Sequence, residues 1–493
     1  MRFKTHLIFV MIAIIMASSI VFAIAETDTA TVGSQAEQIN ASKENESAAG
    51  QIEPPELDRG QILEAINQTE ALLVQEPDNM ETRFQLANLL YQAGNFSVAK
   101  ETLLPVLNDS EPSLEAMLLM AELEYLMGNY DKAEEINQQV METAPDNVQA
   151  QIQAQLNLMF VYYQSNQYAK SLDLFDEMEG QIKLPLLDLM KSFGEESPCQ
   201  IEWNGTNETV VPFLMTDPLP LLPVEIQGEQ IYALIDTGGD TFILDSEIAD
   251  SMGIQPISSF MGSFAGGTQA EVALAKADSI KIGNVTLMSV PIVLRPTQGR
   301  SEEPIDGQYT ISGILGTKIL QQFLPTIDYV NGRLILREKS EEGKLAFQNE
   351  IEGKRVTEVP FCLASTHFMM AKGTLNDKDD LTFFVDSGLA SEAAFTAPIQ
   401  TLEYVGIPVP ETTDSGVSGS GEQVTVGLFP IDTLGLGTLR HHNVTGLYGA
   451  LPPGSYWRHG FITDGIISHQ FLRQYAWTID FSEMEMIFVS EEE

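Results

Sequence analysis

The strongest constraint on the fold of this 493-residue chain is an internal duplication in its second half. Five short motifs occur twice in the same order, and each second copy lies 148 to 154 residues after the first. The paired motifs begin at positions 211 and 359, 236 and 386, 278 and 432, 313 and 465, and 325 and 477. This near-constant spacing predicts two matching all-β lobes, at 200–338 and 356–490, joined by a charged linker at 339–355.

Each lobe contains an apolar run that leads directly into an acidic loop. The first copy is IYALIDTGG, beginning at Ile231, and the second is LTFFVDSGL, beginning at Leu381. An apolar strand followed by Asp and Gly holds a carboxylate at a tight turn, because Gly leaves room for a close backbone approach. Two carboxylates presented in the same way, those of Asp236 and Asp386, indicate a functional pair.

A pair of adjacent carboxylates has a defined chemistry. The two groups cannot both ionise at low cost, so they share one proton and titrate as a coupled pair. The ionised carboxylate can take a proton from a water molecule while the protonated one polarises a peptide carbonyl. The residues therefore favour hydrolysis by general acid–base catalysis, without a covalent intermediate and without a cofactor.

The two lobes resemble the retropepsin-like (clan AA) aspartyl protease family, in duplicated form. The family pattern is an apolar strand into Asp-Thr/Ser-Gly, a glycine-rich flap hairpin, and two apolar residues with Gly before a short helix. Flap candidates lie at 262–267 and 416–423, and the third element is present as ILG from Ile314 and IIS from Ile466. The resemblance implies a bilobal acid-protease fold of tandem β-barrels, with a peptide or protein substrate held between the lobes.

The resemblance also implies roles for individual residues. Asp236 and Asp386 would form the catalytic dyad, one from each lobe. The hydroxyl groups of the dyad loops would bond across to the opposite lobe, and the glycines would give the loops room. The residues implied for dyad-loop support are Thr237, Gly238, Ser387 and Gly388, and those implied for substrate binding are Asp240, Gly266, Gly267, Gly419 and Gly421.

The second lobe departs from the family pattern. Ser468 stands where the first lobe has Gly316, and Ala390 is the counterpart of Asp240, so we expect an asymmetric cleft. These departures leave open an alternative, in which the chain is a catalytically weak or inactive peptide-binding scaffold. A homodimer in which each lobe pairs with its own copy is a further alternative. The unequal loops, DTGG and DSGL, favour pairing within one chain.

The region 57–195, ahead of the lobes, has helical periodicity and an internal repeat. Three stretches align on Gly94, Gly128 and Asn166. Each is followed by an aromatic and a small residue, namely Phe96 and Ala99, Tyr130 and Ala133, and Tyr168 and Ser171. The pattern resembles tetratricopeptide repeats, which are all-α arrays of paired helices. Such arrays usually bind peptide segments of a protein partner on a concave face, and the other interpretation is a spacer or capping domain.

The N-terminal region predicts export to the periplasm or the cell exterior. Residues 1–25 begin with Arg2 and Lys4, continue as an apolar run and end in Ala-Ile-Ala, as a secretory signal peptide does. An uncleaved N-terminal membrane anchor is the alternative. The polar stretch 26–56 is predicted to be a disordered linker. No later stretch resembles a membrane span, so none is expected after signal cleavage.

Composition excludes some classes of partner. Asp and Glu outnumber Lys and Arg by 70 to 26, and the formal net charge of −44 repels nucleic acid. The chain has two cysteines, Cys199 and Cys362, and the sequence leaves open both a disulfide and two free thiols. The pair His441 and His442 has no cluster of carboxylates or cysteines at ligand spacing, so no metal site is predicted.

Overall fold

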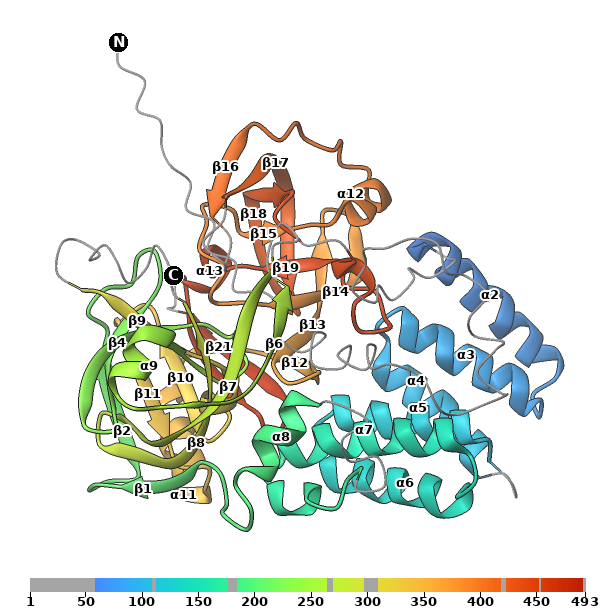
Figure 1. Ribbon diagram of the computed structural model, residues 1–493. Coiled ribbons are helices and arrows are strands. Elements are labelled where there is room, and N and C mark those ends of the chain that lie inside the picture. Colours follow the sequence, from blue (N-terminus) through green and yellow to red (C-terminus); the bar gives the residue numbers. More distant parts are fainter. Residues whose placement is uncertain are drawn as a thin grey trace, which may run out of the picture.

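The computed structural model shows a helical array followed by two β-rich lobes (Figure 1). This order confirms the predicted fold class. None of the helices in the described part of the chain is long and apolar enough to cross a membrane. The described residues are 58–108, 112–175, 184–263, 269–296, 309–417, 423–451 and 454–490. The predicted signal peptide and the linker 26–56 therefore lie outside the described residues.

The helical array is built from antiparallel helix pairs that stack side by side (Figure 1). Helices α3 and α4 form one pair, and α5 and α6 form the next. The N-terminal N–H groups of several helices are capped by the side chains of Asp58, Asn79, Ser113 and Asn147. The elements are α2 (Arg59–Gln75), α3 (Met80–Gln92), α4 (Phe96–Leu107), α5 (Leu114–Leu126), α6 (Tyr130–Thr143), α7 (Val148–Gln164), η2 (Tyr168–Ser171) and α8 (Pro185–Lys191).

The inter-helix turns lie where the sequence repeats align. The backbone is left-handed there, with φ of 78° at Gly94, 76° at Gly128 and 58° at Asn166. Glycine adopts this conformation at little cost, and Asn tolerates it better than most residues. The small residue of each repeat is fully buried, at Ala99, Ala133 and Ser171. The third repeat differs from the other two, because the described residues that follow its turn begin with the short η2 in place of an α-helix.

Lobe one is a barrel closed by strand pairing. Its strands are ordered β1-β8-β5-β9-β4-β3-β7-β6, and a further pairing of β7 with β8 closes six of them into a ring. Strands β4 and β9 run parallel at the centre. The elements are β1 (Gln200–Trp203), β3 (Leu221–Ile226), β4 (Glu229–Ile235), β5 (Phe242–Asp245), α9 (Ser246–Ser251), β6 (Pro256–Ser263), β7 (Gln269–Ile282), β8 (Val285–Arg295), β9 (Ile311–Leu315) and α10 (Thr317–Leu320).

Lobe two repeats this topology. The pairing of β17 with β13 closes the ring β13-β14-β19-β15-β18-β17, in which β14 and β19 run parallel as β4 and β9 do in lobe one. Two closed barrels of the same connectivity are what the duplication predicts. The elements are β13 (Phe368–Leu375), β14 (Lys378–Val385), β15 (Phe395–Thr396), α12 (Ile399–Val405), β16 (Asp414–Val417), β17 (Gln423–Leu436), β18 (Leu439–Tyr448), η5 (Ser455–Trp457), β19 (Gly465–Ile467) and α13 (His469–Leu472).

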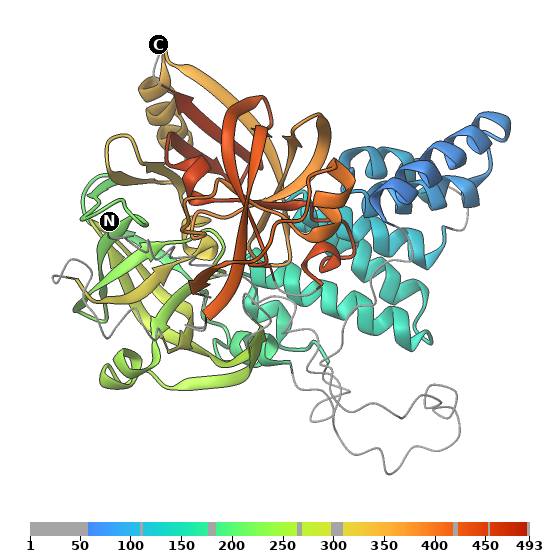
Figure 2. The ribbon, with the colours of Figure 1, turned by 90° about the horizontal axis from the view of Figure 1, so that it is seen from above.

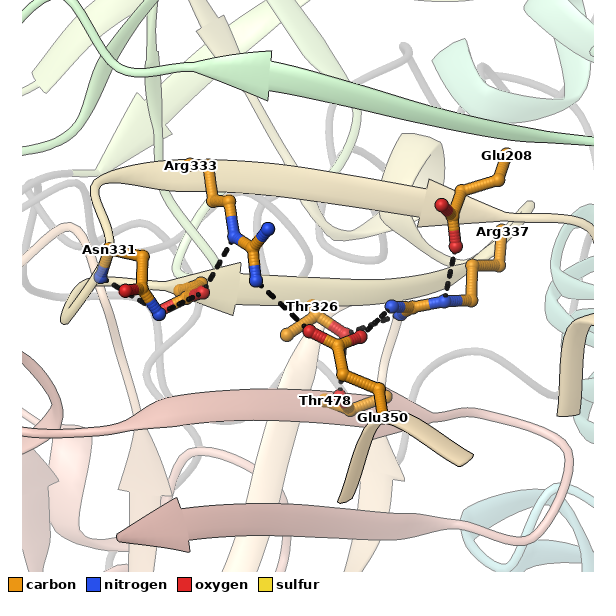
Figure 3. Close-up of polar contacts among 8 residues, drawn as sticks. Glu208, Thr326, Asn331, Arg333, Arg337, Glu350 and Thr478 are labelled. Atoms are coloured by element: carbon orange, nitrogen blue, oxygen red, sulfur yellow. Dashed lines mark hydrogen bonds and ion pairs between the residues drawn. The ribbon is translucent and has the colours of Figure 1, made fainter. Parts of the chain in front are cut away.

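A shared antiparallel sheet joins the lobes. Its order is β2-β11-β10-β20-β21-β12. The first three strands belong to lobe one, and the other three belong to lobe two. At its centre Thr326 lies opposite Thr478, and the two hydroxyls are 2.6 Å apart (Figure 3). The strands are β2 (Glu208–Pro212), β10 (Leu324–Asp328), β11 (Arg333–Arg337), β12 (Arg355–Ala364), β20 (Ala476–Asp480) and β21 (Glu485–Ser490).

The segment between the lobes contains a helix, α11 (Glu341–Ile351), which is attached to this sheet. The buried side chain of Arg337 donates to Glu208 at 2.8 Å and to Thr326 at 2.9 Å, and it pairs with Glu350 of α11 (Figure 3). Arg333 binds the other oxygen of Glu350 at 3.0 Å. The predicted linker 339–355 is therefore a helical connector that two arginines hold against the shared sheet.

The helical array lies along one side of both lobes (Figures 1 and 2). Its inter-helix turns are among the points of contact. A Cβ at Gly94 would overlap the hydroxyl of Thr382 in β14, and one at Gly128 would meet the side chain of Met484. The Asn166 amide donates to Gln322 of lobe one at 2.8 Å. Buried apolar side chains from the array and from the lobes form common hydrophobic clusters, so the array and the lobes share cores.

Both cysteines are free in the structure. Cys199 is buried ahead of β1, and Cys362 is partly buried on β12. Burial raises the thiol pKa of each to about 12. The question that the sequence left open is therefore answered in favour of two separate thiols.

Candidate active site

Lobe one holds its acidic loop through the parallel strands β4 and β9. Strand β4 ends at Ile235, and the N–H of Asp236 donates to the carbonyl of Leu315 at the end of β9, at 3.1 Å. The loop then turns back on itself, and the N–H of Gly238 donates to Oδ1 of Asp236 at 2.8 Å. These contacts fix the carboxyl group at the end of two apolar strands.

Lobe two builds the same loop in the same way. The N–H of Asp386 donates to the carbonyl of Ile467, at the end of β19, at 3.0 Å. The N–H of Gly388 donates to Oδ1 of Asp386 at 2.8 Å. The two loops therefore agree in strand support, in turn geometry and in the orientation of the carboxyl oxygen.

The loops grip each other across the interface between the lobes. The N–H of Thr237 donates to Oγ of Ser387 at 2.9 Å, and the N–H of Ser387 donates to Oγ1 of Thr237 at 3.0 Å. The Thr237 hydroxyl in turn donates to the carbonyl of Val385 at 3.2 Å. We call these three bonds the reciprocal grip. They join residues of one chain.

The grip places each carboxyl group against the glycine of the other loop. A Cβ at Gly238 would lie 2.6 Å from the carboxyl atoms of Asp386, and one at Gly388 would lie closer still to those of Asp236. Real Cβ atoms do not approach other atoms so closely, so each loop requires glycine at this position. The structure thus brings together all six dyad and loop-support residues predicted from the sequence.

Burial of the pair controls its charge. Asp236 is 2% exposed and Asp386 is 0% exposed. Burial, and then the negative charge of Asp236, raise the pKa of Asp386 well above its usual value. The pair therefore retains one proton at pH values where an exposed Asp is ionised.

Two family models match parts of the chain. A family model described as "Aspartyl protease" matches residues 222–319, from β3 into α10. The first lobe matches the aspartyl protease family. A second model, described as "Anaphase-promoting complex, cyclosome, subunit 3", matches residues 58–140 and supports the tetratricopeptide-like repeats. No curated protein matches the chain.

The match to the aspartyl protease family ends before lobe two begins. It includes Asp236, the hairpin of β6 and β7, and the strand β9 that leads to Gly316. Lobe two reaches the same arrangement through its own residues, as the contacts of Asp386 show. The family match and the reciprocal grip together support a protease-like function for the bilobal region.

In lobe one, helix α10 supports the dyad loop from behind. The Thr317 hydroxyl donates to the carbonyl of Thr237 at 2.9 Å, and the N–H of Thr317 donates to Gly239 at the same distance. Gly316 lets the two segments approach, because a Cβ there would lie 2.8 Å from the carbonyl oxygen of Gly239 and closer still to that of Thr241.

Lobe two makes room for Ser468 instead of Gly. Its loop is longer, since eight residues lie between Asp386 and Phe395 at the start of β15, whereas five lie between Asp236 and Phe242 at the start of β5. The Ser468 hydroxyl donates to the carbonyl of Ala393 at 2.6 Å, within the longer loop. This departure from the family pattern is thus compensated locally.

Asp240, which the sequence predicts to bind substrate, contacts the helical array. Its side chain is buried, and Oδ2 accepts a hydrogen bond of 3.1 Å from the Tyr163 hydroxyl of helix α7. Burial raises its pKa to about 6, against the opposing effect of Lys318. Its counterpart Ala390 is buried in an apolar cluster with Leu219, Leu221, Leu234 and Ile311. The two loops are therefore asymmetric, as expected: the helical array binds Asp240, whereas apolar side chains of lobe one surround Ala390.

The flap candidates are hairpins, as predicted. Strands β6 and β7 form one, and β16 and β17 form the other. Their tips lie outside the described residues, and so do the predicted substrate-binding residues Gly266, Gly267, Gly419 and Gly421.

One side chain beside the dyad, that of Tyr329, was not predicted from the sequence. The buried phenol of Tyr329 has its pKa raised by burial and then by the charges of Asp236 and Asp386, so it lies near both. His469 packs against the Tyr329 ring at 5.1 Å between centroids, and burial lowers the His469 pKa to about 4. A signal was present for Tyr329, because it directly follows the duplicated TID motif.

The polar residues that the sequence singled out elsewhere have structural contacts. His441 shares a hydrogen bond of 2.7 Å with the Tyr475 hydroxyl and stacks on Phe471. Within the described ranges, no group of three or more His, Cys, Asp or Glu side chains is arranged to hold a metal ion.

Proposed function

We propose that this protein is an aspartic endopeptidase in which Asp236 and Asp386, one from each lobe of a single chain, activate a water molecule. The observation that carries the proposal is the reciprocal grip. It supports two carboxyl groups that lie against each other's loop glycines, in a buried setting that retains one proton. The family match of lobe one supports the same chemistry.

The proposed reaction follows from the shared proton. Asp386 carries it, and the ionised Asp236 accepts a proton from the attacking water. The hydroxide forms a bond to the peptide carbon, while the proton on Asp386 moves to the carbonyl oxygen. Collapse of the tetrahedral intermediate returns one proton to the dyad and delivers the other to the leaving amine as the C–N bond breaks. Protons balance, and no covalent enzyme intermediate forms.

A peptide library digestion tests the proposal. The protein comprising residues 26–493 is incubated with unbiased peptides from about pH 3 to about pH 7, and products are identified by mass spectrometry. We expect cleavage by the wild type and none by Asp236→Asn or Asp386→Asn. Asp480→Asn is the matched control, because the Asp480 carboxyl accepts the N–H groups of Ser482 and Glu483 in a turn. Cleavage that persists in both dyad variants would refute the assignment.

A peptide-binding protein without catalysis is the second candidate. Two observations favour this second function: both dyad carboxyl groups are almost completely buried, and the Asp240 carboxyl already accepts a hydrogen bond from Tyr163. The same library separates the two functions. Peptides that bind wild type and Asp236→Asn equally and remain intact with both would establish binding without hydrolysis.

Export is part of the proposal and rests on the sequence of residues 1–25. The test is N-terminal sequencing of protein recovered outside the cytoplasm. We expect the mature chain to begin at Glu26. Recovery of the intact N-terminus in a membrane fraction would instead identify an uncleaved anchor.

The repeats provide a candidate surface for a protein partner. The edge that carries the inter-helix turns is already occupied by the lobes. A partner would therefore meet other faces of the array. Capture of a partner that is lost on substituting exposed helix residues, with cleavage of small peptides unchanged, would support this role.

A further inference from the structure

Two charged side chains of the lobes contact the helical array, each beside the strand that supports a dyad loop. Asp464 directly precedes β19 in lobe two, and Lys318 lies in α10 directly after β9 in lobe one. The spacing of 152 residues between Thr326 and Thr478 places Ser312 opposite Asp464 and Gln470 opposite Lys318. Each lobe therefore has one charged anchor that the other lobe lacks.

The anchor of lobe two is an ion pair with the first helix of the array. The guanidinium of Arg59, at the start of α2, donates through Nε to Oδ1 of Asp464 at 2.8 Å and through Nη2 to Oδ2. Arg59 is 4% exposed and Asp464 is 0% exposed. A buried carboxylate held by two parallel N–H groups has a fixed position and orientation.

Asp464 also binds the strand that carries the catalytic residue of lobe two. Its Oδ2 accepts the N–H of Thr382 at 2.8 Å, and its own N–H donates to the Thr382 carbonyl at 2.8 Å. Thr382 lies on β14, which ends one residue before Asp386. The chain of contacts from Arg59 to the dyad thus passes through a single side chain and one strand.

The anchor of lobe one is a lysine at the end of helix α7. The Lys318 ammonium donates to the carbonyls of Tyr163 and Gln164, the latter at 3.1 Å. It also lies 4.7 Å from the centre of the Tyr163 ring. The last carbonyls of a helix have no partners within the helix, and a cation there is stabilised by the helix dipole. Lys318 is fully buried, so this contact is closed to solvent.

Helix α10 connects Lys318 to the dyad loop through hydrogen bonds. The N–H of Lys318 donates to the carbonyl of Asp240 at 2.6 Å, and the neighbouring Thr317 binds the carbonyl of Thr237. The Tyr163 hydroxyl binds the side chain of Asp240 from the other side. The end of α7 therefore contacts both segments that flank the dyad loop of lobe one.

We propose that the helical array is a brace for the catalytic dyad. Arg59 fixes the dyad strand of lobe two, the end of α7 fixes the dyad loop of lobe one, and the rigid array between these points keeps the reciprocal grip in register. Arg59, Asp464 and Lys318 are then positioning residues of the active site. The inference that the register serves catalysis rests on the proposed function, whereas the brace itself is a property of the fold.

Hydrogen exchange in the full chain tests the brace without any activity. The readouts are the amides of Thr237 and Ser387, which form the grip and touch neither anchor. We expect Arg59→Met and Lys318→Met each to raise the exchange rate of both amides by about tenfold or more, because the array then no longer fixes the two dyad loops relative to each other. Lys132→Met is the control, since it removes an exposed ion pair on the same array and should leave both amides unchanged.

A milder variant guards against loss of the fold. Arg59→Lys keeps the charge but loses the two-pronged contact, and we expect it to raise exchange at the same amides to a smaller extent. If α2 and the end of α7 exchange faster in all three anchor variants while both grip amides stay protected, the array is merely attached and the brace is refuted.

Kinetics with a peptide substrate from the library provide the second readout. Anchor variants should lower kcat by about tenfold with KM within about twofold, because binding is retained and dyad geometry is lost. An unchanged kcat would contradict the positioning role. A wild type that cleaves no peptide would refute the proposed function, and the exchange measurement would still decide whether the array is a brace.

Discussion

The two dyad loops reach one geometry by different means. Lobe one uses a short loop, packs it against α10 through Gly316 and ties Asp240 to the helical array. Lobe two uses a loop three residues longer, places Ser468 at the helix start and buries Ala390 among apolar side chains of lobe one. The contacts of the two Asp residues themselves differ by no more than 0.1 Å, at 3.1 and 3.0 Å to the supporting strands.

The comparison shows which features the site tolerates and which it requires. The carboxyl group, the hydroxyl beside it and the following glycine are common to both loops, and each has a contact in the opposite lobe. The residues one step further out differ because their partners differ. Departures of lobe two from the family pattern therefore fall outside the set of atoms that form the dyad.

The largest expected effect concerns the two carboxyl groups. Asp236→Asn and Asp386→Asn should each lower kcat/KM by about a hundredfold to ten thousandfold, because general acid–base catalysis needs both members of the pair. Steady-state kinetics on one library peptide measures this. A loss in one variant but not in the other would break the equivalence of the lobes and indicate that a single carboxyl group does the work.

The next effect separates the two helix starts. Gly316→Ala should destabilise the protein by about 3 kcal/mol, because a Cβ there overlaps backbone atoms of the dyad loop. Ser468→Ala removes only a hydroxyl that binds Ala393 and caps α13, and it should cost about 1 kcal/mol. Urea denaturation of both variants measures the difference. Equal costs would show that the longer loop of lobe two gives no extra room.

The grip itself gives the third prediction. Thr237→Val keeps the shape of the side chain but leaves the buried N–H of Ser387 and the carbonyl of Val385 without partners, so it should cost about 2 kcal/mol. Thr237→Ser keeps the hydroxyl and is the matched control. Thermal unfolding compares the two variants, and an undiminished melting temperature in Thr237→Val would mean that the loops are held by packing alone.

The smallest expected effect is a dependence on pH that comes from lobe one. The Asp240 pKa is raised from 3.8 to about 6, so between these values the folded state binds more protons than the unfolded state. The unfolding free energy should therefore fall as pH rises through this window. Asp240→Asn should remove that part of the fall, when compared in an Asp386→Asn background that silences the dyad. Ala390 gives lobe two no such contribution.

Much of the fold and the core of the site could be predicted from the sequence. The duplication fixes the register of Thr326 on Thr478, and the apolar runs before Asp236 and Asp386 are the strands that carry them. The repeat alignment predicts the left-handed turn at Gly94, because only a residue that tolerates positive φ fits there. These features depend on local chemistry or on similarity within the chain.

The attachment of the helical array could not be predicted in the same way. Arg59 and Asp464 are separated by 405 positions, and neither side chain reveals its partner in a single sequence. A weaker signal exists in the charges of Asp464 and Lys318, which stand inside short apolar runs where an unpaired charge would be costly to bury. That signal predicts a partner but not which one, because the partner comes from another domain.

Strand β21 sets the order in which a newly made chain can acquire its site. It pairs with both β12 and β20, and β20 in turn carries Thr478 against lobe one. When a nascent chain has left the ribosome only as far as residue 480, both acidic loops have emerged. Strand β21, which completes the sheet shared by the two lobes, has not. Peptide cleavage by such a nascent chain should therefore be absent until residues 485–490 have emerged.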